Sequence, residues 1–258
     1  MSQIAYSRHD RVGTIVMGRG PANGIDISFV RDFDAAIEAA ERDTDCLVVV
    51  VRSNLSGFFS GGGDVNRFRE NAPQQNTEMI AFLHETLSKL TQSEKIYIAE
   101  IDGHALGGGY EIALACDLRF ASTGNYRIGL PEVKLGLFPA AGGTQRLASL
   151  IGPARALEFM ITGTTVTAEE ALQLGLVTRL FTEAELTEQT LAYAKQMASA
   201  ATPAISKIKR SIYDGFCSQL SVGFAMERRH IATLFASEDV ATRLTAFIER
   251  KKLSSANR

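Results

Sequence analysis

The sequence has few cysteines and almost no net charge, and both shortages narrow the class of protein. Its three cysteines, Cys46, Cys116 and Cys217, lie far apart and form no CxxC pair. This excludes a disulfide framework and a CxxC metal site, and it indicates a reducing compartment. The formal net charge of −2 argues against a nucleic-acid footprint spread over the surface. A local basic patch for a small anion remains compatible with that charge.

Long hydrophobic runs are missing as well. No apolar stretch approaches the roughly 20 residues that would span a bilayer. Residues 1–17 lack a cationic region followed by an apolar core and a cleavage site, so no signal peptide is expected. We therefore expect a cytoplasmic protein with neither a membrane nor a nucleic acid as partner.

Glycine, in contrast, is concentrated in one part of the chain. Of the 22 glycines in 258 residues, 13 fall between Gly57 and Gly143. They show no collagen-like period, and the leucine, valine and isoleucine around them argue against a disordered linker. Glycines among apolar residues indicate backbone that turns tightly or approaches something closely.

Hydrophobic patterning predicts alternating strands and helices, with strands at 5–17, 46–51 and 96–101 and helices at 28–42, 77–90 and 110–116. Asp26 or Ser28 is the expected cap of the first helix. A strand, a glycine turn and a helix in succession are typical of βα units with a mainly parallel sheet. Beyond about Gly143 few strand signals occur, and successive patterns are helical, at 145–150, 153–162, 168–174, 183–199, 203–215, 220–236 and 238–252. We therefore predict an α/β core over residues 1–195 and a helical C-terminal section over 196–258.

A glycine-rich turn before a helix first suggests nucleotide phosphates, but the spacing argues against them. Counting from Gly107, the sixth position of a G-x-G-x-x-G motif is Ile112. Gly103 and Gly108 have P-loop spacing, yet Gly109 stands where the lysine is required. No G-x-S-x-G elbow occurs, and the four histidines lack metal-ligand spacing. These spacings argue against four classes of protein: a dinucleotide enzyme, an NTPase, an α/β-hydrolase and a zinc enzyme.

Simpler chemistry remains for the two glycine clusters, 61–63 and 107–109. Backbone N–H groups at a turn and at a helix N-terminus are aimed donors with partial positive charge. One donor from each cluster can converge on an oxygen that becomes negative during a reaction. The alternative is that the glycines only permit tight turns.

Two carboxylates favour the catalytic interpretation. Glu111 falls in the first turn of the helix that Gly107–Gly109 opens, and Glu132 follows Pro131 in an otherwise apolar stretch. Burying a carboxylate in such an apolar stretch costs free energy unless a partner or a function compensates for it. Glu132 is either a solvated loop acid or the partner of Glu111 in acid/base work.

At these residues the sequence resembles the crotonase, or enoyl-CoA hydratase/isomerase, superfamily. The resemblance rests on Phe-Ser-Gly-Gly-Gly-Asp-Val at 59–65, on the segment 101–117 that contains His-Ala-Leu-Gly-Gly-Gly-Tyr-Glu, and on the segment 129–147 that runs from Gly-Leu-Pro-Glu to Gly-Gly-Thr-Gln-Arg-Leu. A weaker match covers 237–252. The order and spacing of these motifs persist over essentially the whole chain.

The resemblance implies a spiral of ββα turns and a helical section that builds trimers, commonly paired into hexamers. It implies a coenzyme A thioester as substrate, no metal or redox cofactor, and a role in fatty acid metabolism. The backbone N–H groups of Gly63 and Gly108 are expected to form the oxyanion hole. Glu111 and Glu132 match the two catalytic glutamates of the hydratases, with Glu111 as base toward water and Glu132 as acid toward C2. Contacts to substrate and coenzyme A are expected from Ser60, Gly61, Gly62, Asp64, Val65, Ala140 and Lys251.

Several of these residues have simpler interpretations or depart from the family pattern. For Asp64 we favour a helix cap, and for His104 and Tyr110 packing or a local hydrogen bond. Ala140 stands where hydratases often have glycine, and Leu130 replaces a polar residue. The expected function is hydration of a 2-enoyl-CoA to a 3-hydroxyacyl-CoA. The alternatives are double-bond isomerisation, another acyl-CoA lyase or hydrolase reaction on this scaffold, and, remotely, RNA binding.

Overall fold

The computed structural model describes residues 3–200 and 202–216 together with Glu238 and Thr242. The chain divides into two units, Met1–Ala198 and Ser199–Arg258, and each is described by itself. Helix α9, Thr202–Phe216, belongs to the second unit. None of the described helices combines the length and the apolar character needed to cross a bilayer.

A six-stranded sheet is the base of the first unit, with strand order β1-β2-β3-β5-β7-β10. The first two strands form an antiparallel hairpin, and every other neighbouring pair is parallel. The strands are β1 (Ile4–His9), β2 (Val12–Met17), β3 (Val48–Ser53), β5 (Ile96–Ile101), β7 (Leu118–Ser122) and β10 (Arg179–Phe181). The four valines of β3 are fully buried, as expected of a parallel strand that is covered on both faces.

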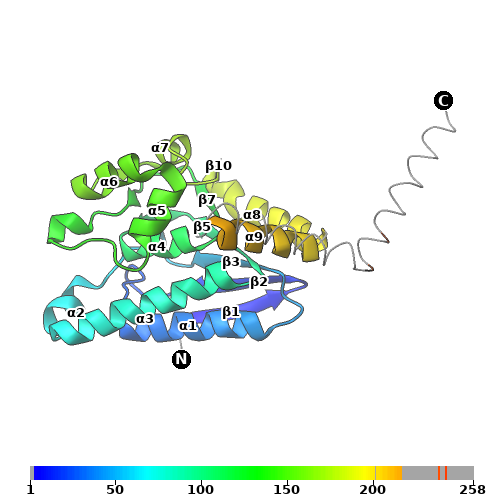
Figure 1. The fold of residues 1–258 in the computed structure, drawn as a ribbon, viewed down its shortest axis with the longest axis horizontal. Coiled ribbons are helices and arrows are strands. Elements are labelled where there is room, and N and C mark those ends of the chain that lie inside the picture. The colour runs from blue at the N-terminus through cyan, green and yellow to red at the C-terminus, as the bar shows by residue number, and fades with distance from the viewer. Residues whose placement is uncertain (1–2, 201, 217–237, 239–241, 243–258) are drawn as a thin grey trace. The chain divides into compact units, whose positions relative to one another are not determined.

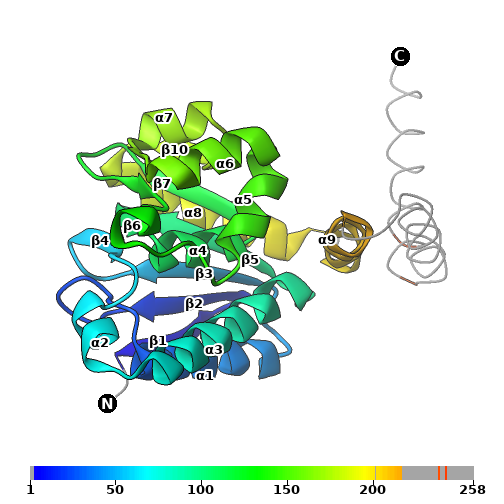
Figure 2. The ribbon, with the colours of Figure 1, turned by 60° about the vertical axis from the view of Figure 1, so that its left-hand side comes forward.

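Helices cover the two faces of this sheet. Helix α1 (Ile27–Arg42) and helix α3 (Pro73–Gln92) lie side by side along one face (Figures 1 and 2). Helix α8 (Glu183–Ser199) packs its apolar residues against the opposite face, where Val50, Ile98 and Phe120 point. The Asp26 side chain caps α1 by accepting hydrogen bonds from the N–H groups of Ser28 and Phe29, both at 2.9 Å.

A second, smaller sheet carries the functional loops. Its strand order is β4-β6-β8-β9, with β4 (Gly57–Ser60), β6 (Gly103–Leu106), β8 (Ile128–Gly129) and β9 (Thr165–Val166). The first three strands run parallel to one another. Strand β3 is followed by β4, β5 by β6, and β7 by β8, so each pass of the chain adds one strand to each sheet before a helix begins. This alternation is the spiral of ββα turns that the resemblance implies.

The remaining described helices of the first unit are α2 (Val65–Glu70), α4 (Gly108–Ala115), the 3-10 helix η1 (Glu132–Leu135), α5 (Gly143–Ile151), α6 (Pro153–Thr162) and α7 (Ala168–Gln173), of which α4 packs against β4 and β6. The hairpin and the helices predicted between residues 5 and 215 are confirmed within a few residues. Beyond Gly143, where few strand signals were expected, the structure has the two short strands β9 and β10; each is two or three residues long and pairs with a distant strand. The helices predicted at 220–236 and 238–252 lie almost wholly outside the described residues.

Candidate active site

Three loops that are distant in sequence meet at one edge of the small sheet. Strands β4, β6 and β8 are parallel neighbours, so their carboxyl ends lie at the same edge, and the chain leaves each strand there. The first loop carries the glycine cluster 61–63, the second carries 107–109, and the third carries Glu132. The Gly107 N–H donates to the Gly129 carbonyl at 2.9 Å, which fastens the second loop to the third. Parallel pairing of these short strands is what assembles the site.

Two backbone N–H groups face this junction. A Cβ placed on Gly62 would lie 3.4 Å from the Gly108 nitrogen, and one placed on Gly108 would lie 3.9 Å from the Gly63 nitrogen, so the two turns touch. The Gly108 N–H opens α4 and has no acceptor within its own helix. Within the described part of the chain, neither it nor the Gly63 N–H donates to another backbone group. Such a pair can bind one oxygen that gains negative charge.

The first loop is held by its own side chains and by residues 22–25. The Ser60 hydroxyl is fully buried; it accepts from the Gly62 N–H at 3.1 Å and donates to the Asn23 carbonyl at 2.8 Å. The Gly61 N–H donates to the Ala22 carbonyl at 2.8 Å. The backbone of Gly62 has a φ of +86°, and a Cβ there would lie 2.5 Å from the Leu106 carbonyl oxygen, so only glycine fits. Ser60 thus shapes the loop that presents the Gly63 N–H.

Asp64 caps helix α2, as the sequence predicted. Its carboxylate accepts from the N–H groups of Asn66 and Arg67 at 3.1 and 3.2 Å. Val65, the first residue of α2, is 53% exposed and therefore accessible to a ligand. Lys251, the other expected coenzyme A contact, lies outside the described residues.

Glu111 is buried between the N-termini of two helices. It lies in the first turn of α4, and its Oε1 accepts from the N–H groups of Ala141 and Gly143, both at 2.8 Å. Gly143 is the first residue of α5, so the positive ends of two helix dipoles favour the carboxylate. Burial raises the pKa of Glu111, while the two N–H donors and the charge of Arg146 lower it. Burial is the largest of these effects and the pKa of Glu111 is raised overall, while the donors limit the rise.

Glu132 has a different environment. It begins η1, and its Oε2 is buried without a hydrogen-bond partner among the described residues. The pKa of Glu132 is raised to about 7, mainly by burial and also by the negative charge of Glu111, while a hydrogen bond from its own backbone lowers it. The Oε1 atom lies close to Gly107, where a Cβ would come within 3.1 Å of it. With a pKa of about 7, Glu132 keeps a substantial protonated fraction near neutral pH and can give up a proton there.

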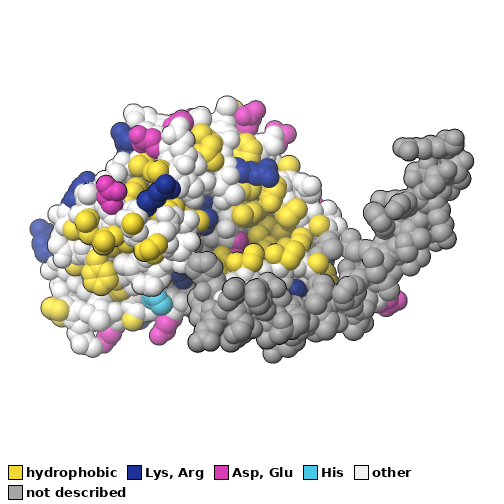
Figure 3. All heavy atoms as spheres, turned by 45° about the horizontal axis from the view of Figure 1, so that its top comes forward, with side chains coloured by type: hydrophobic (Ala, Val, Ile, Leu, Met, Phe, Trp, Pro, Cys, Tyr) yellow, Lys and Arg dark blue, Asp and Glu magenta, His cyan; other side chains and the backbone are white. Residues whose placement is uncertain are grey.

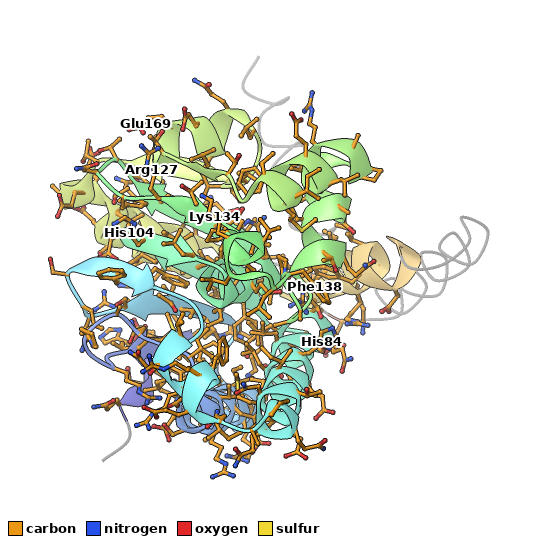
Figure 4. All side chains as sticks on the ribbon, turned by 90° about the vertical axis from the view of Figure 1, so that its left-hand side faces the viewer. His84, His104, Arg127, Lys134, Phe138 and Glu169 are labelled. Atoms are coloured by element: carbon orange, nitrogen blue, oxygen red, sulfur yellow. The ribbon has the colours of Figure 1, made fainter. Side chains whose placement is uncertain are left out.

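The loop that follows Glu132 borders the same site. Ala140 is half-buried and directly precedes Ala141, whose N–H binds Glu111. Leu130 is fully buried and supplies no polar group to orient Glu132. Figure 4 labels Lys134 and Phe138 on this segment, and the Phe138 side chain is 69% exposed.

Two residues near the motifs have structural roles, as expected. The Nδ1 of His104 accepts from the Arg127 N–H at 3.0 Å, and its ring lies 5.1 Å from that of Phe58. Figure 4 shows His104 and Arg127 toward one edge of the unit. The buried Tyr110 hydroxyl donates to the Leu176 carbonyl at 2.9 Å. No cluster of His, Cys, Asp or Glu suited to a metal ion occurs in the described part of the chain.

Sequence reasoning missed the residues that hold Glu111. The N–H groups of Ala141 and Gly143 are about thirty positions away in the chain, and backbone donors carry no side-chain signature. The available signal was the run Ala-Ala-Gly-Gly-Thr-Gln-Arg at 140–146, a glycine turn that opens a helix. It has the same form as the turn at 107–109.

Comparison with known proteins agrees with this geometry. A model of the enoyl-CoA hydratase/isomerase family matches residues 7–257. A crystal structure of an enoyl-CoA hydratase from Geobacillus kaustophilus HTA426 superposes with a TM-score of 0.94 at 43% sequence identity, covering 97% of this chain and 95% of the other. The fold is therefore that of the crotonase superfamily.

Curated relatives give the same result. The chain is 31% identical to the short-chain-enoyl-CoA hydratase of Clostridium acetobutylicum, over 98% of this chain and 97% of that protein. It is 34% identical to the 2,3-dehydroadipyl-CoA hydratase of Escherichia coli K12, over 97% of both chains. The chain belongs to the enoyl-CoA hydratase/isomerase family and is an enzyme of that kind.

Proposed function

We propose that the protein adds water to the double bond of a 2-enoyl-CoA thioester and releases a 3-hydroxyacyl-CoA. The observation that carries this proposal is the pair of unlike glutamates. Glu111 is held by two N–H donors, and Glu132 has a pKa of about 7. Both lie near the two turns whose Gly63 and Gly108 N–H groups donate to no other backbone group among the described residues. Unlike environments for two carboxyl groups are the arrangement that acid and base roles require.

The reaction assigns one role to each group. The thioester carbonyl oxygen accepts hydrogen bonds from the Gly63 and Gly108 N–H groups. The Glu111 carboxylate removes a proton from water while the water oxygen bonds to C3, and negative charge develops on the carbonyl oxygen. Glu132 then gives its proton to C2. Each oxyanion donor contributes about 3–4 kcal/mol to transition-state stabilisation. A proton passing from Glu111 to Glu132, directly or through solvent, restores the starting state.

The substrate is proposed to be an acyl-CoA bound across the three loops. The first loop, Ser60 to Val65, and Ala140 are the expected contacts for the thioester end, and Lys251 for the coenzyme A phosphates. One relative is named for short-chain enoyl-CoA and another for 2,3-dehydroadipyl-CoA, so acyl groups of both kinds belong in a substrate panel. The proposed reaction needs no metal or redox cofactor, and coenzyme A is part of the substrate. We place the protein in the cytoplasm and in fatty acid metabolism.

We further propose that the enzyme is a homotrimer or homohexamer. Apolar side chains gather in patches on the surface shown in Figure 3. Leu157 and Ile161, four residues apart on α6, are 59% and 61% exposed, and Ile208 and Ile212 on α9 are 59% and 58% exposed. Pairs at this spacing form an apolar stripe on one helix face, which is typical of a surface covered by a partner.

Light scattering on the purified full chain tests the assembly. We expect a trimer or hexamer mass, and a smaller mass for the Leu157→Asp, Ile161→Asp double variant. A monomeric wild type would contradict the proposed assembly without touching the proposed reaction.

An absorbance assay with crotonyl-CoA tests the reaction. We expect loss of the conjugated-thioester absorbance and a product heavier by one water molecule. No loss at high enzyme concentration, with crotonyl-CoA and with long, branched, aromatic and dicarboxylic 2-enoyl-CoA thioesters, would contradict hydration. Conversion of a 3-enoyl-CoA to its 2-isomer without hydration would identify an isomerase instead.

A further inference from the structure

The turn that binds Glu111 is itself held by an arginine. Ala141 donates its N–H to the Glu111 Oε1 at 2.8 Å, and its carbonyl accepts from Nη1 of Arg146 at 2.8 Å. One peptide segment therefore connects the guanidinium to the carboxylate. The second donor is the N–H of Gly143, and Gly143 is the first residue of α5, the helix that carries Arg146.

Two glycines in this turn make room for the two charged groups. A Cβ on Gly142 would collide with the guanidinium of Arg146, and Gly142 has a φ of +105° that side chains rarely adopt. A Cβ on Gly143 would lie 2.8 Å from the Oε1 of Glu111. The pair leaves space for the guanidinium on one side of the turn and for the carboxylate on the other.

We propose that Arg146 is a positioning residue for the proposed hydration, fixing the turn whose N–H groups orient Glu111 and favouring the carboxylate form of Glu111 by its charge. The inference rests on the proposed function, because it gives Glu111 the role of base. Arg146 need not touch the substrate in order to act in this way.

Few charged groups among the described residues face Glu111, so the charge of Arg146 can affect its pKa. Arg146 faces it from α5, and Glu132 faces it from η1. Helix α3, which packs on α4, presents the buried apolar residues Leu83 and Leu87 on its inner face. The charge of Arg146 lowers the pKa of Glu111 against the effect of burial. Removing that charge therefore raises the pKa and reduces the fraction of Glu111 that can act as base.

Kinetics of two Arg146 variants test the proposal. Arg146→Gln removes the positive charge, whereas Arg146→Lys keeps the charge but lacks the planar guanidinium group with its several N–H donors. For Arg146→Gln we expect kcat for crotonyl-CoA to fall on the order of 10- to 100-fold, while KM changes little. The acid limb of its pH profile should move to higher pH. Arg146→Lys should keep the acid limb near its wild-type position while losing part of kcat. Arg155→Gln, the same change at an exposed position on α6, is the control and should behave as wild type.

A titration without turnover separates this proposal from the proposed function. In protein with carbon-13 at the glutamate carboxyl carbons, the Glu111 signal is assigned by its loss in Glu111→Gln. Its midpoint should lie higher in Arg146→Gln than in wild type, even if the wild type hydrates no substrate tested. An unchanged midpoint in a folded Arg146→Gln or Arg146→Ala variant would overturn the proposal, whatever happens to kcat. If neither neutral variant folds, an acid limb displaced upward in Arg146→Lys would overturn the charge role.

Discussion

Glu111 and Glu132 lie at one edge of the small sheet, but their carboxyl groups have different hydrogen-bond partners. Two N–H groups at 2.8 Å bind the Oε1 of Glu111, whereas the Oε2 of Glu132 has no partner among the described residues. The difference follows from position. Glu111 lies between two helix N-termini, and Glu132 enters the same space from a 3-10 turn.

Replacing either glutamate by glutamine should abolish most of the activity. Glutamine keeps the size of the side chain but neither removes nor supplies a proton, so we expect kcat for hydration to fall about 10²- to 10⁴-fold in Glu111→Gln and in Glu132→Gln. Crotonyl-CoA turnover measures the loss. Glu169→Gln, at the exposed glutamate labelled in Figure 4, is the matched control. Near-normal turnover in either active-site variant would remove that residue from the mechanism.

The pH dependence should report Glu132 on its basic side. Glu132 acts in the protonated form, and its pKa is raised to about 7, so kcat/KM should decrease as the pH rises through about 7. A rate profile in buffers of constant ionic strength measures this limb. The residual activity of Glu132→Gln should lack it. A wild-type profile that stays flat up to about pH 9 would contradict the assignment.

The same carboxyl group should make stability depend on pH. The folded pKa of Glu132 is about 7 against 4.5 for an ordinary glutamate, so between these values the folded chain keeps a proton that the unfolded chain has released. Wild-type stability therefore falls relative to Glu132→Gln across that window. We expect the variant to be more stable by about 1–3 kcal/mol at pH 8, with no difference below pH 4.5. Urea unfolding at equal protein concentration measures the difference, and a variant less stable at pH 8 would contradict the burial account.

Gly107 should matter for activity beyond its effect on folding. It has a φ of +52°, and a Cβ there would lie 3.1 Å from the Oε1 of Glu132. Gly107→Ala should cost about 1–2 kcal/mol in stability and reduce kcat on the order of 10²-fold by displacing Glu132. Gly175→Ala is the matched control, because Gly175 has a φ of +75° with open space around it. Equal effects of the two substitutions on kcat would show that strain alone is responsible.

Much of the fold was predictable because periodicity is a local property. The helices at 153–162 and 183–199 and the buried strand at 96–101 were predicted with the bounds that the structure gives them. The small sheet was not predicted, because strands of two to four residues such as β8 have too few positions to show alternation. Their pairing depends on contacts between distant segments.

The site could be predicted in its side chains but not in its supports. Glu111 was predicted from its place in the first helical turn after Gly107–Gly109, and Glu132 because a carboxylate in an apolar stretch requires compensation. The two N–H donors to Glu111 and the guanidinium of Arg146 come from a turn whose place beside α4 is decided by tertiary packing. No local pattern around Glu111 points to them.

Hydrogen exchange at C2 tests the division of roles most directly. A saturated thioester such as butyryl-CoA has no double bond to hydrate, but its C2 proton can be removed by the group that serves C2 in the proposed reaction. In deuterium oxide, nuclear magnetic resonance should show deuterium entering C2 with wild type and with Glu111→Gln, and not with Glu132→Gln. Exchange that persists in Glu132→Gln and is lost in Glu111→Gln would contradict the account.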